Sequence, residues 1–370
     1  MKKLLCLLLC LCVLPSALSE TLRDGRDTRT QNLPKRFAVY EAEEGVSPTT
    51  GLKLSDRAAI AGEGFAGLAI TGRYQPMLVQ IDNTNGGAGD IAPWGVYYAD
   101  IVYEFPLHAS GATRLSALFS DLMPTSVGPM RSARVGAVWT RAEWDAGFMY
   151  YGQQTLKGSS VPDELNRTGA KFGEVRFNGT DSDTKPWKQY YSRRKNLVAP
   201  HNAQGNAAAI STLIPETHVA RPHVLPFTNV QATGGDRAET ITVYWGSPTI
   251  EYTLVWDEPS KGYLRYCHHK DGSLELWVDQ DRGEPIVFQN VIIQFTQTTY
   301  RGGSSAPVTT VTGRGNAEYF QSGEHFEGIW SRPQMTDQTL YYLANRKRLQ
   351  FQKGRTLIVM LPVQKQVGWE

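Results

Sequence analysis

Two acidic and three basic residues lie within a short part of the chain. They are two carboxylates, Asp100 and Glu104, and three arginines, Arg114, Arg131 and Arg134. A guanidinium group can hold a carboxylate or a phosphate through two parallel hydrogen bonds. We therefore expect these side chains to form a polar site that binds an anionic ligand. Asp100 and the three arginines are its predicted binding residues, and Glu104 is a candidate catalytic carboxylate.

The segment around Ser132 is expected to begin a helix. Apolar residues at helical spacing predict a helix over residues 135–145. Free backbone amides and the helix dipole favour an anion at such an end, so Ser132 joins the predicted ligand-binding residues. In the alternative interpretation, Ser132 only caps the helix, and the arginines pair with Asp100 and Glu104.

Asp82 and Asn83 follow an apolar run, residues 77–81, and precede the glycine-rich segment 85–89. Loops at strand ends commonly carry ligands, so both residues are candidates for the site. The alternative is an Asx turn, in which such a side chain accepts a hydrogen bond from nearby backbone amides.

His201 and Asn202 come directly after Pro200. Histidine can act as an acid or a base near neutral pH, and Asn202 could donate to an oxyanion or cap the following helix. An enzyme would use His201 with Asp82 or Glu104 as its carboxylate partner. No nucleophile-elbow pattern surrounds Ser132, which argues against a hydrolytic triad.

Two features restrict the chemistry. On one strand, Asp100 and Glu104 would lie about 13 Å apart, too far for the paired carboxylates of a glycosidase; pairing of Glu104 with Arg114 is the structural alternative. Adjacent His268 and His269 would face opposite sides of a strand, so they are not expected to bind one metal ion together. The sequence also lacks a glycine-rich loop of the kind that binds nucleotide phosphates. We predict no metal site and no cofactor.

The first 19 residues have the pattern of a secretory signal: two lysines, an apolar run over 4–14, and small residues before a cleavage point after Ser19. No later segment offers the roughly 20 uninterrupted apolar residues of a membrane helix. Cleavage would leave Cys267 as the one cysteine, so no internal disulfide is expected. An exported protein without disulfides suits a bacterial envelope.

The mature chain is expected to be nearly neutral. Loss of Lys2 and Lys3 lowers the count of Lys plus Arg from 38 to 36, against 36 Asp plus Glu. A nucleic-acid-binding protein would show a large positive excess or a basic face. We therefore expect no nucleic-acid partner.

Strand and helix patterns predict an α+β chain. Residues 20–46 are polar and indicate a solvated tether. Strands alternate with helices over 47–232, which predicts a mixed α/β domain carrying the polar site. Residues 233–370 contain short alternating runs that predict a mostly antiparallel β domain.

Four linked motifs carry a resemblance to a known family. They are Ala99–Glu104, Thr113-Arg114, Gly128–Arg134 and Ala199–Asn202, and the similarity continues to Lys353–Thr356. In this order the motifs resemble the YerB-like family of bacterial envelope lipoproteins. The resemblance implies two domains, a location outside the cytoplasm, and no assigned function.

The N-terminal cysteines depart from the family pattern. Cys6, Cys10 and Cys12 each follow a leucine, whereas a lipoprotein signal needs a small residue before its cysteine. We interpret them as apolar residues of the signal peptide.

The sequence leaves three hypotheses for the function of the protein. It could bind an anionic cell-wall glycan or peptide fragment, act on the wall as a hydrolase or transferase, or serve as a scaffold for wall-synthesis enzymes.

Overall fold

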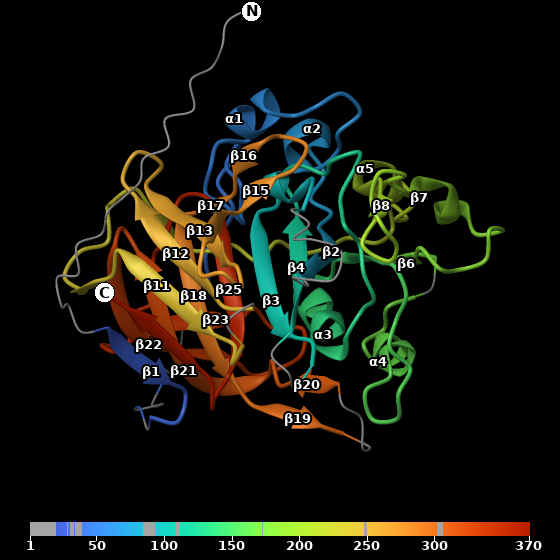
Figure 1. The fold of residues 1–370 in the computed structure, drawn as a ribbon. Helices are drawn as coiled ribbons and strands as arrows, with labels where there is room; N and C mark the ends of the chain where they lie inside the picture. Colours follow the sequence, from blue (N-terminus) through green and yellow to red (C-terminus); the bar gives the residue numbers. More distant parts are fainter. Residues whose placement is uncertain are drawn as a thin grey trace, which may run out of the picture.

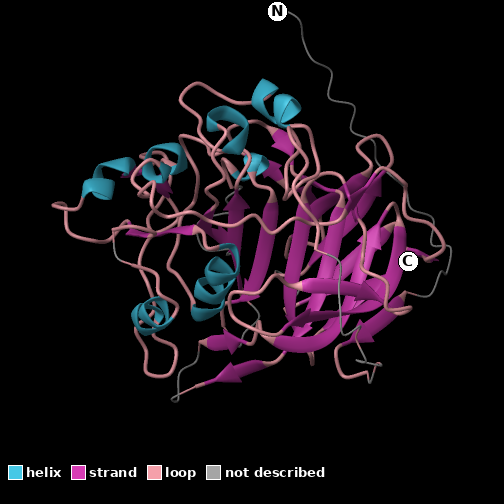
Figure 2. Ribbon diagram, turned by 180° about the vertical axis from the view of Figure 1, so that it is seen from behind, coloured by secondary structure: helices cyan, strands magenta, loops and turns pink. Residues whose placement is uncertain are grey.

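The structure is a computed structural model that describes residues 20–27, 29, 33, 39–83, 93–108, 112–171, 173–247, 250–301 and 306–370. The predicted signal over 1–19, its cysteines and the glycine-rich segment 85–89 lie outside the described residues. Strands dominate the described chain, mainly in antiparallel pairs (Figures 1 and 2). The helices are α1 (Leu54–Ala59), α2 (Leu68–Thr71), α3 (Val135–Trp144), α4 (Val161–Arg167) and α5 (Ala207–Ser211), with 3₁₀ turns η1 (Val96–Tyr98) and η2 (Pro186–Tyr190).

One large sheet contains strands from both halves of the chain. Its central pair joins β25 in parallel with β3, and β25 also runs parallel to β18. The predicted boundary near residue 232 therefore separates two sequence regions that share a sheet. In spatial order its strands are β10 (Asp236–Arg237), β22 (Glu324–Arg332), β21 (Gly313–Gln321), β18 (Asn290–Thr296), β25 (Thr356–Pro362), β3 (Ile101–Pro106), β4 (Thr113–Phe119), β2 (Met77–Asn83), β5 (Gly147–Tyr150) and β6 (Arg176–Asn178), and β23 (Leu340–Leu343) pairs with β22.

A second sheet covers one face of the large sheet. Contacts such as Phe320 with Trp369 and Tyr252 with Glu104 join the two layers. Its strands are β1 (Thr21–Asp24), β26 (Gln366–Trp369), β11 (Thr240–Tyr244), β12 (Tyr252–Asp257), β13 (Gly262–His268) and β14 (Leu274–Leu276), with β17 (Val287–Phe288) beside β13. Short pairs complete the fold: β7 (Tyr191–Arg193) with β8 (Ala203–Gly205), β9 (Phe227–Thr228) with β24 (Phe351–Gln352), β15 (Val278–Asp279) with β16 (Glu284–Pro285), and β19 (Thr298–Tyr300) with β20 (Pro307–Thr309).

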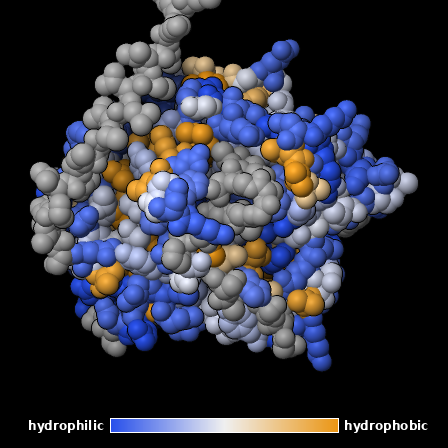
Figure 3. All heavy atoms as spheres, viewed as in Figure 1, coloured by the Kyte–Doolittle hydropathy of each residue, from blue (hydrophilic) through white to orange (hydrophobic). Residues whose placement is uncertain are grey.

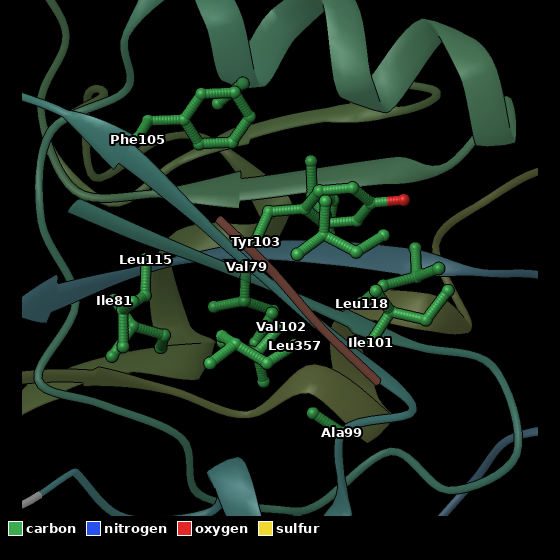
Figure 4. Close-up of a cluster of buried hydrophobic side chains, with 14 of the residues drawn as sticks. Val79, Ile81, Ala99, Ile101, Val102, Tyr103, Phe105, Leu115, Leu118 and Leu357 are labelled. Atoms are coloured by element: carbon green, nitrogen blue, oxygen red, sulfur yellow. The ribbon is translucent and has the colours of Figure 1, made fainter. Parts of the chain in front are cut away.

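The central strands β2, β3 and β4 are buried on both faces, which explains why their sequences are near-continuous apolar runs. Figure 4 shows Phe105 on the side of a helix, and Val102 and Leu357 on the other side of the sheet. The helix is α3, because the Phe105 ring lies against Gly136 of that helix. Alternation along β3 and β4 thus sorts their polar residues between two faces.

The predicted tether over 20–46 is wrong for its first described residues. Residues 21–24 form β1 and pair with β26. The Arg29 guanidinium forms an ion pair with buried Glu318 and donates to the carbonyls of Ala317 and Gly328. Burial of this arginine against a carboxylate fastens the segment to the sheet.

Candidate anion site

Two adjacent strands place Asp82 and Arg114 side by side. Asp82 stands near the end of β2 and Arg114 near the start of β4, and the antiparallel register sets them opposite one another. Phe105 of β3 is the other neighbour of Arg114. Directly opposed residues point to the same face, so Asp82 and Arg114 lie on the α3 side of the sheet.

The segment before α3 brings Arg131 to the same place. The Asp82 amide donates to the Pro129 carbonyl at 2.8 Å, and the Arg131 amide donates to the Gln80 carbonyl at 3.1 Å. These bonds fix the segment along β2. Arg131 Nε then lies 3.2 Å from Oδ2 of Asp82.

The loop before β8 places His201 beside Asp82. The Met130 amide donates to the Ala203 carbonyl at 2.7 Å, so β8 lies along the same segment. A side chain at Gly128 would come within 2.7 Å of that carbonyl, which explains the need for glycine there. His201 Nδ1 lies 2.6 Å from Oδ2 of Asp82.

We call Asp82, Arg114, Arg131, Arg134 and His201 the guanidinium cluster. Its charge is unbalanced, because Asp82 is the one carboxylate that the described structure places within ion-pair distance of these arginines. Arg114 Nη2 is 4.0 Å from Asp82 Oδ1, and Arg134 donates to the carbonyls of Ser132 and Ala133. Arg114 and Arg131 therefore share one carboxylate, and Arg134 pairs with none among the described residues.

Burial raises the free-energy cost of keeping these guanidinium groups charged without enough carboxylate partners. The Arg114 side chain is 2% exposed, and its one hydrogen bond to a described residue goes to the Ser132 carbonyl at 3.3 Å. Burial, with the neighbouring arginines, lowers the pKa of Arg114 to about 9 despite the opposing effect of Asp82. Burial, and then Arg131, lower the pKa of Arg134 to about 10. A bound anion would offset both penalties.

Three members of the cluster are partly exposed to solvent: Arg131, Arg134 and His201. The side chain of Arg131 is 25% exposed and that of His201 is 17% exposed, whereas Asp82 is 4% exposed. An incoming group would meet Arg131 and His201 first. Arg114 lies beneath them.

Glu104 does not belong to this cluster, contrary to our expectation. Its register partner on β4 is Leu115, so it points to the face covered by the second sheet, away from Arg114. It is fully buried and accepts from Asn83, Thr113 and Tyr252. Neither catalysis with His201 nor the alternative pairing with Arg114 fits this position.

Asn83 lies on the same face of the sheet as Glu104 and outside the cluster, because successive residues of β2 point to opposite faces. Its amide nitrogen donates to Glu104 at 3.0 Å and to Thr113 at 2.7 Å. Its oxygen accepts from Arg265, which stacks on Tyr252. The predicted ligand-binding role of Asn83 is replaced by this internal network.

Asp100 lies at the opposite end of β3, in a cluster of its own. Its carboxylate accepts from Arg57 at 3.1 Å and from both the amide and the hydroxyl of Ser120. Asp121 faces the same arginine at 3.3 Å. We call Asp100, Asp121, Arg57 and Ser120 the Asp100 cluster. The expectation that Asp100 shares a site with Arg131 is wrong.

Ser132 and Asn202 bind backbone. Ser132 donates to the Tyr151 carbonyl, and Arg134 rather than Ser132 is the N-cap residue of α3. Asn202 donates to the carbonyls of Arg194 and Leu197 and accepts from Arg193 at 2.7 Å. The expected helix cap at Asn202 is also wrong, since Asn206 caps α5. Ser132 is the neighbour of Arg131 in the chain and Asn202 is the neighbour of His201. Their hydrogen bonds therefore hold the backbone next to these two cluster residues.

Sequence reasoning missed a basic and aromatic rim. The Arg193 guanidinium lies 4.7 Å from the Tyr151 ring centre, and Lys188 Nζ lies 5.9 Å from it. The Tyr151 amide donates to the Arg131 carbonyl, so this rim adjoins the cluster. The signal was the run of Trp, Tyr, Lys and Arg over 186–195, but no pattern linked it to residue 131.

Metal binding receives no support from the geometry of the described residues. They contain no group of three His, Cys, Asp or Glu side chains able to hold an ion. Among them, no helix is long and apolar enough to cross a bilayer.

Two family models match the chain, on either side of the predicted boundary. Residues 65–220 match the N-terminal domain of the protein of unknown function DUF3048, and residues 241–358 match its C-terminal domain. The chain belongs to the DUF3048 family. The family resemblance carried by the four motifs is thereby confirmed.

Relatives of this DUF3048 chain include a protein named "Putative lipoprotein YerB" from Bacillus subtilis (strain 168). It is 24% identical over 273 residues, covering 72% of this chain and 76% of the relative. The crystal structure of the YerB protein from Bacillus subtilis matches with a TM-score of 0.65 and 22% identity, over 86% of this chain and 96% of that chain. The DUF3048 chain therefore shares the YerB fold.

Proposed function

We propose that this protein is an extracytoplasmic envelope protein that binds an anionic ligand through the guanidinium cluster. The observation that carries the proposal is Arg114, a buried guanidinium whose nearest carboxylate among the described residues, that of Asp82, lies 4.0 Å away. A buried charge is normally paired or neutralised, because an isolated one is expensive to desolvate. An anion between Arg114, Arg131 and Arg134 would supply the missing charge.

The ligand is a carboxylate or a phosphate. Planar guanidinium forks match both groups, and several of them around one point favour a group with more than one acceptor oxygen. The predicted export signal and the name of the YerB relative support an envelope location. A cell-wall peptide or glycan fragment with free carboxylates meets both conditions, as does a wall polymer carrying phosphate.

Titration calorimetry tests this proposal with two soluble probes, a muropeptide with free carboxylates and glycerol phosphate. Arg131→Ala and Arg134→Ala should each weaken binding of the preferred probe about tenfold or more, since each removes charge-assisted hydrogen bonds. Arg221→Ala, at an exposed arginine outside the cluster, is the matched control and should bind as the parent does. Unchanged affinity in both cluster variants would exclude the clamp.

A hydrolase or transferase is the second candidate, favoured by the contact between His201 and Asp82. A carboxylate on Nδ1 fixes the tautomer and orientation of an imidazole, which leaves Nε2 to exchange a proton. Nε2 forms no hydrogen bond with the described residues. Incubation with muropeptides, followed by mass spectrometry, decides the matter: turnover lost in His201→Gln supports an enzyme, and fragments left intact by the parent protein reject it.

The scaffold alternative lacks a docking surface among the described residues. Their large exposed apolar side chains are scattered, and Tyr300 is the one aromatic among them. On the face drawn in Figure 3, apolar residues form several separate patches between hydrophilic ones. A partner-binding surface usually gathers such anchors at its centre.

A further inference from the structure

A hollow of about 360 Å³ lies where the two sequence regions meet, away from the guanidinium cluster. Figure 1 shows α1 beside β16, and these elements form its opposite sides. Its size suits a small molecule, and ligand sites favour such junctions. We call it the junction pocket, and the lining residues used below are Leu52, Asp56, Arg57, Ile60, Val287 and Arg355.

Arg355 gives the pocket a cation without a carboxylate partner among the described residues. Its guanidinium donates to three backbone carbonyls, those of Ala99, Val287 and Tyr97. These bonds hold the group rigidly and use three of its five N–H donors. Burial, and then the nearby Arg57, lower the pKa of Arg355 to about 10. The remaining donors are available to an anionic oxygen.

Arg57 adds a second set of donors. Its Nη2 donates to the Tyr98 carbonyl and to Asp100, and its Nε lies 3.3 Å from Asp121. Its Nη1 forms no hydrogen bond with any residue that the structure describes. The side chain is nonetheless buried, with the residue 5% exposed. Arg57 and Arg355 therefore present spare N–H groups to one hollow.

Asp56 places a carboxylate on the same hollow. It is exposed, and within the described chain it accepts only a 3.4 Å hydrogen bond from Ser55 and forms no ion pair. Opposite charges that line one hollow without meeting leave room for a molecule that carries both. Apolar side chains of Leu52, Ile60 and Val287 complete the wall.

We propose that the junction pocket binds a small zwitterion, an amino acid or a dipeptide. Its carboxylate would accept from Arg355 and Arg57, and its ammonium group would face Asp56. The apolar wall would receive a small aliphatic side chain. The proposal is independent of the anion site, with which it shares no residue.

Titration calorimetry with alanyl-alanine at up to millimolar concentration tests this site. We expect saturable binding by the parent protein, and weakening of about tenfold or more for the N-acetylated and the C-amidated dipeptides, each of which lacks one charge. No measurable binding of alanyl-alanine, or equal binding of the blocked forms, would overturn the proposal.

Variants locate the binding. Asp56→Asn should weaken alanyl-alanine about tenfold and leave the N-acetylated form unchanged. Asp163→Asn is the matched control, because Asp163 is likewise an exposed aspartate in the first turn of a helix, α4. Arg131→Ala should leave binding intact, and its loss there would move the dipeptide to the guanidinium cluster and overturn the assignment. Unchanged affinity in Asp56→Asn would also overturn it.

Discussion

The guanidinium cluster and the Asp100 cluster use the same residue types at opposite ends of the same strands. In the Asp100 cluster two carboxylates surround one arginine, and hydroxyls and amides satisfy the oxygens of Asp100. The guanidinium cluster contains three arginines and one carboxylate, which pairs with two of them, and Arg131 and Arg134 are partly exposed. The carboxylates of the first cluster are paired within it, and within the described chain only Nη1 of Arg57 is left over, toward the junction pocket. The second cluster has more positive charge than its single carboxylate can neutralise.

This contrast separates a structural role from a binding role. A charged network that is buried and satisfied stabilises the fold as long as it stays intact. An arginine cluster with too few acceptors contributes little stability by itself, and the missing acceptors describe its ligand. Residue type alone would have assigned both clusters the same role.

Removal of the Asp100 carboxylate should have the largest effect. Asp100→Ala removes one of the two carboxylates that face Arg57 and leaves the Ser120 amide without its buried acceptor, so we expect a loss of about 3–5 kcal/mol in the free energy of unfolding. Urea denaturation measures it. Asp183→Ala, at an exposed aspartate, should stay within about 0.5 kcal/mol. A similarly small loss for Asp100→Ala would remove the distinction between the clusters.

The pH dependence of stability should carry the signature of Asp121. Burial, and then the charge of Asp100, raise the pKa of Asp121 to about 7. A carboxyl pKa raised in the folded state adds stability at low pH, and this stability is lost as the pH rises through 7. Between pH 5 and pH 8 the parent protein should lose about 2 kcal/mol more than Asp121→Asn. Parallel urea-denaturation curves for the two proteins would contradict this.

Substitution of Arg114 should separate stability from binding. Arg114→Met fills the same space without a charge, so without ligand we expect a change below about 1.5 kcal/mol in the free energy of unfolding. Affinity for the anionic probe should fall about tenfold or more. Thermal denaturation with and without the probe measures both. A variant that is strongly destabilised but still binds would make Arg114 a structural residue.

Exchange of Arg131 for lysine should give the smallest effect. Arg131→Lys keeps the charge but loses the bidentate fork, so its affinity should fall between those of the parent and Arg131→Ala. Calorimetry ranks the three proteins. Equal affinity of the lysine variant and the parent would indicate that charge alone attracts the ligand.

The sequence allowed the family, the central strands and the helix after Ser132 to be predicted. Apolar runs bounded by breakers are local signals, and β2, β3, β4 and α3 lie where these signals indicate. The insertion of β25 between β18 and β3 is a long-range pairing with no local signal. The division of the chain at residue 232 therefore missed the shared sheet.

The same limit applied to the site. The expectation that Asp82, Arg131 and His201 meet came from their residue types, and their contacts depend on backbone pairing between distant segments. Glu104 was misassigned because its face depends on the register of β3 with β4. Asp100 was misassigned because β3 begins at Ile101, which leaves Asp100 in the preceding turn. Whether the cluster binds a ligand stays a prediction.

NMR of the arginine Nε–H groups can observe the proposed ligand at the guanidinium cluster itself. The signals of Arg114, Arg131 and Arg134 are assigned by their loss in single variants, and inorganic phosphate or a muropeptide is then titrated into the parent protein. We predict that all three signals shift together and saturate, while the signal of Arg141, whose Nε donates to the Ala146 carbonyl outside both proposed sites, stays in place. Signals of the three arginines that do not move with either probe, at concentrations up to tens of millimolar, would contradict the assignment of an anion site.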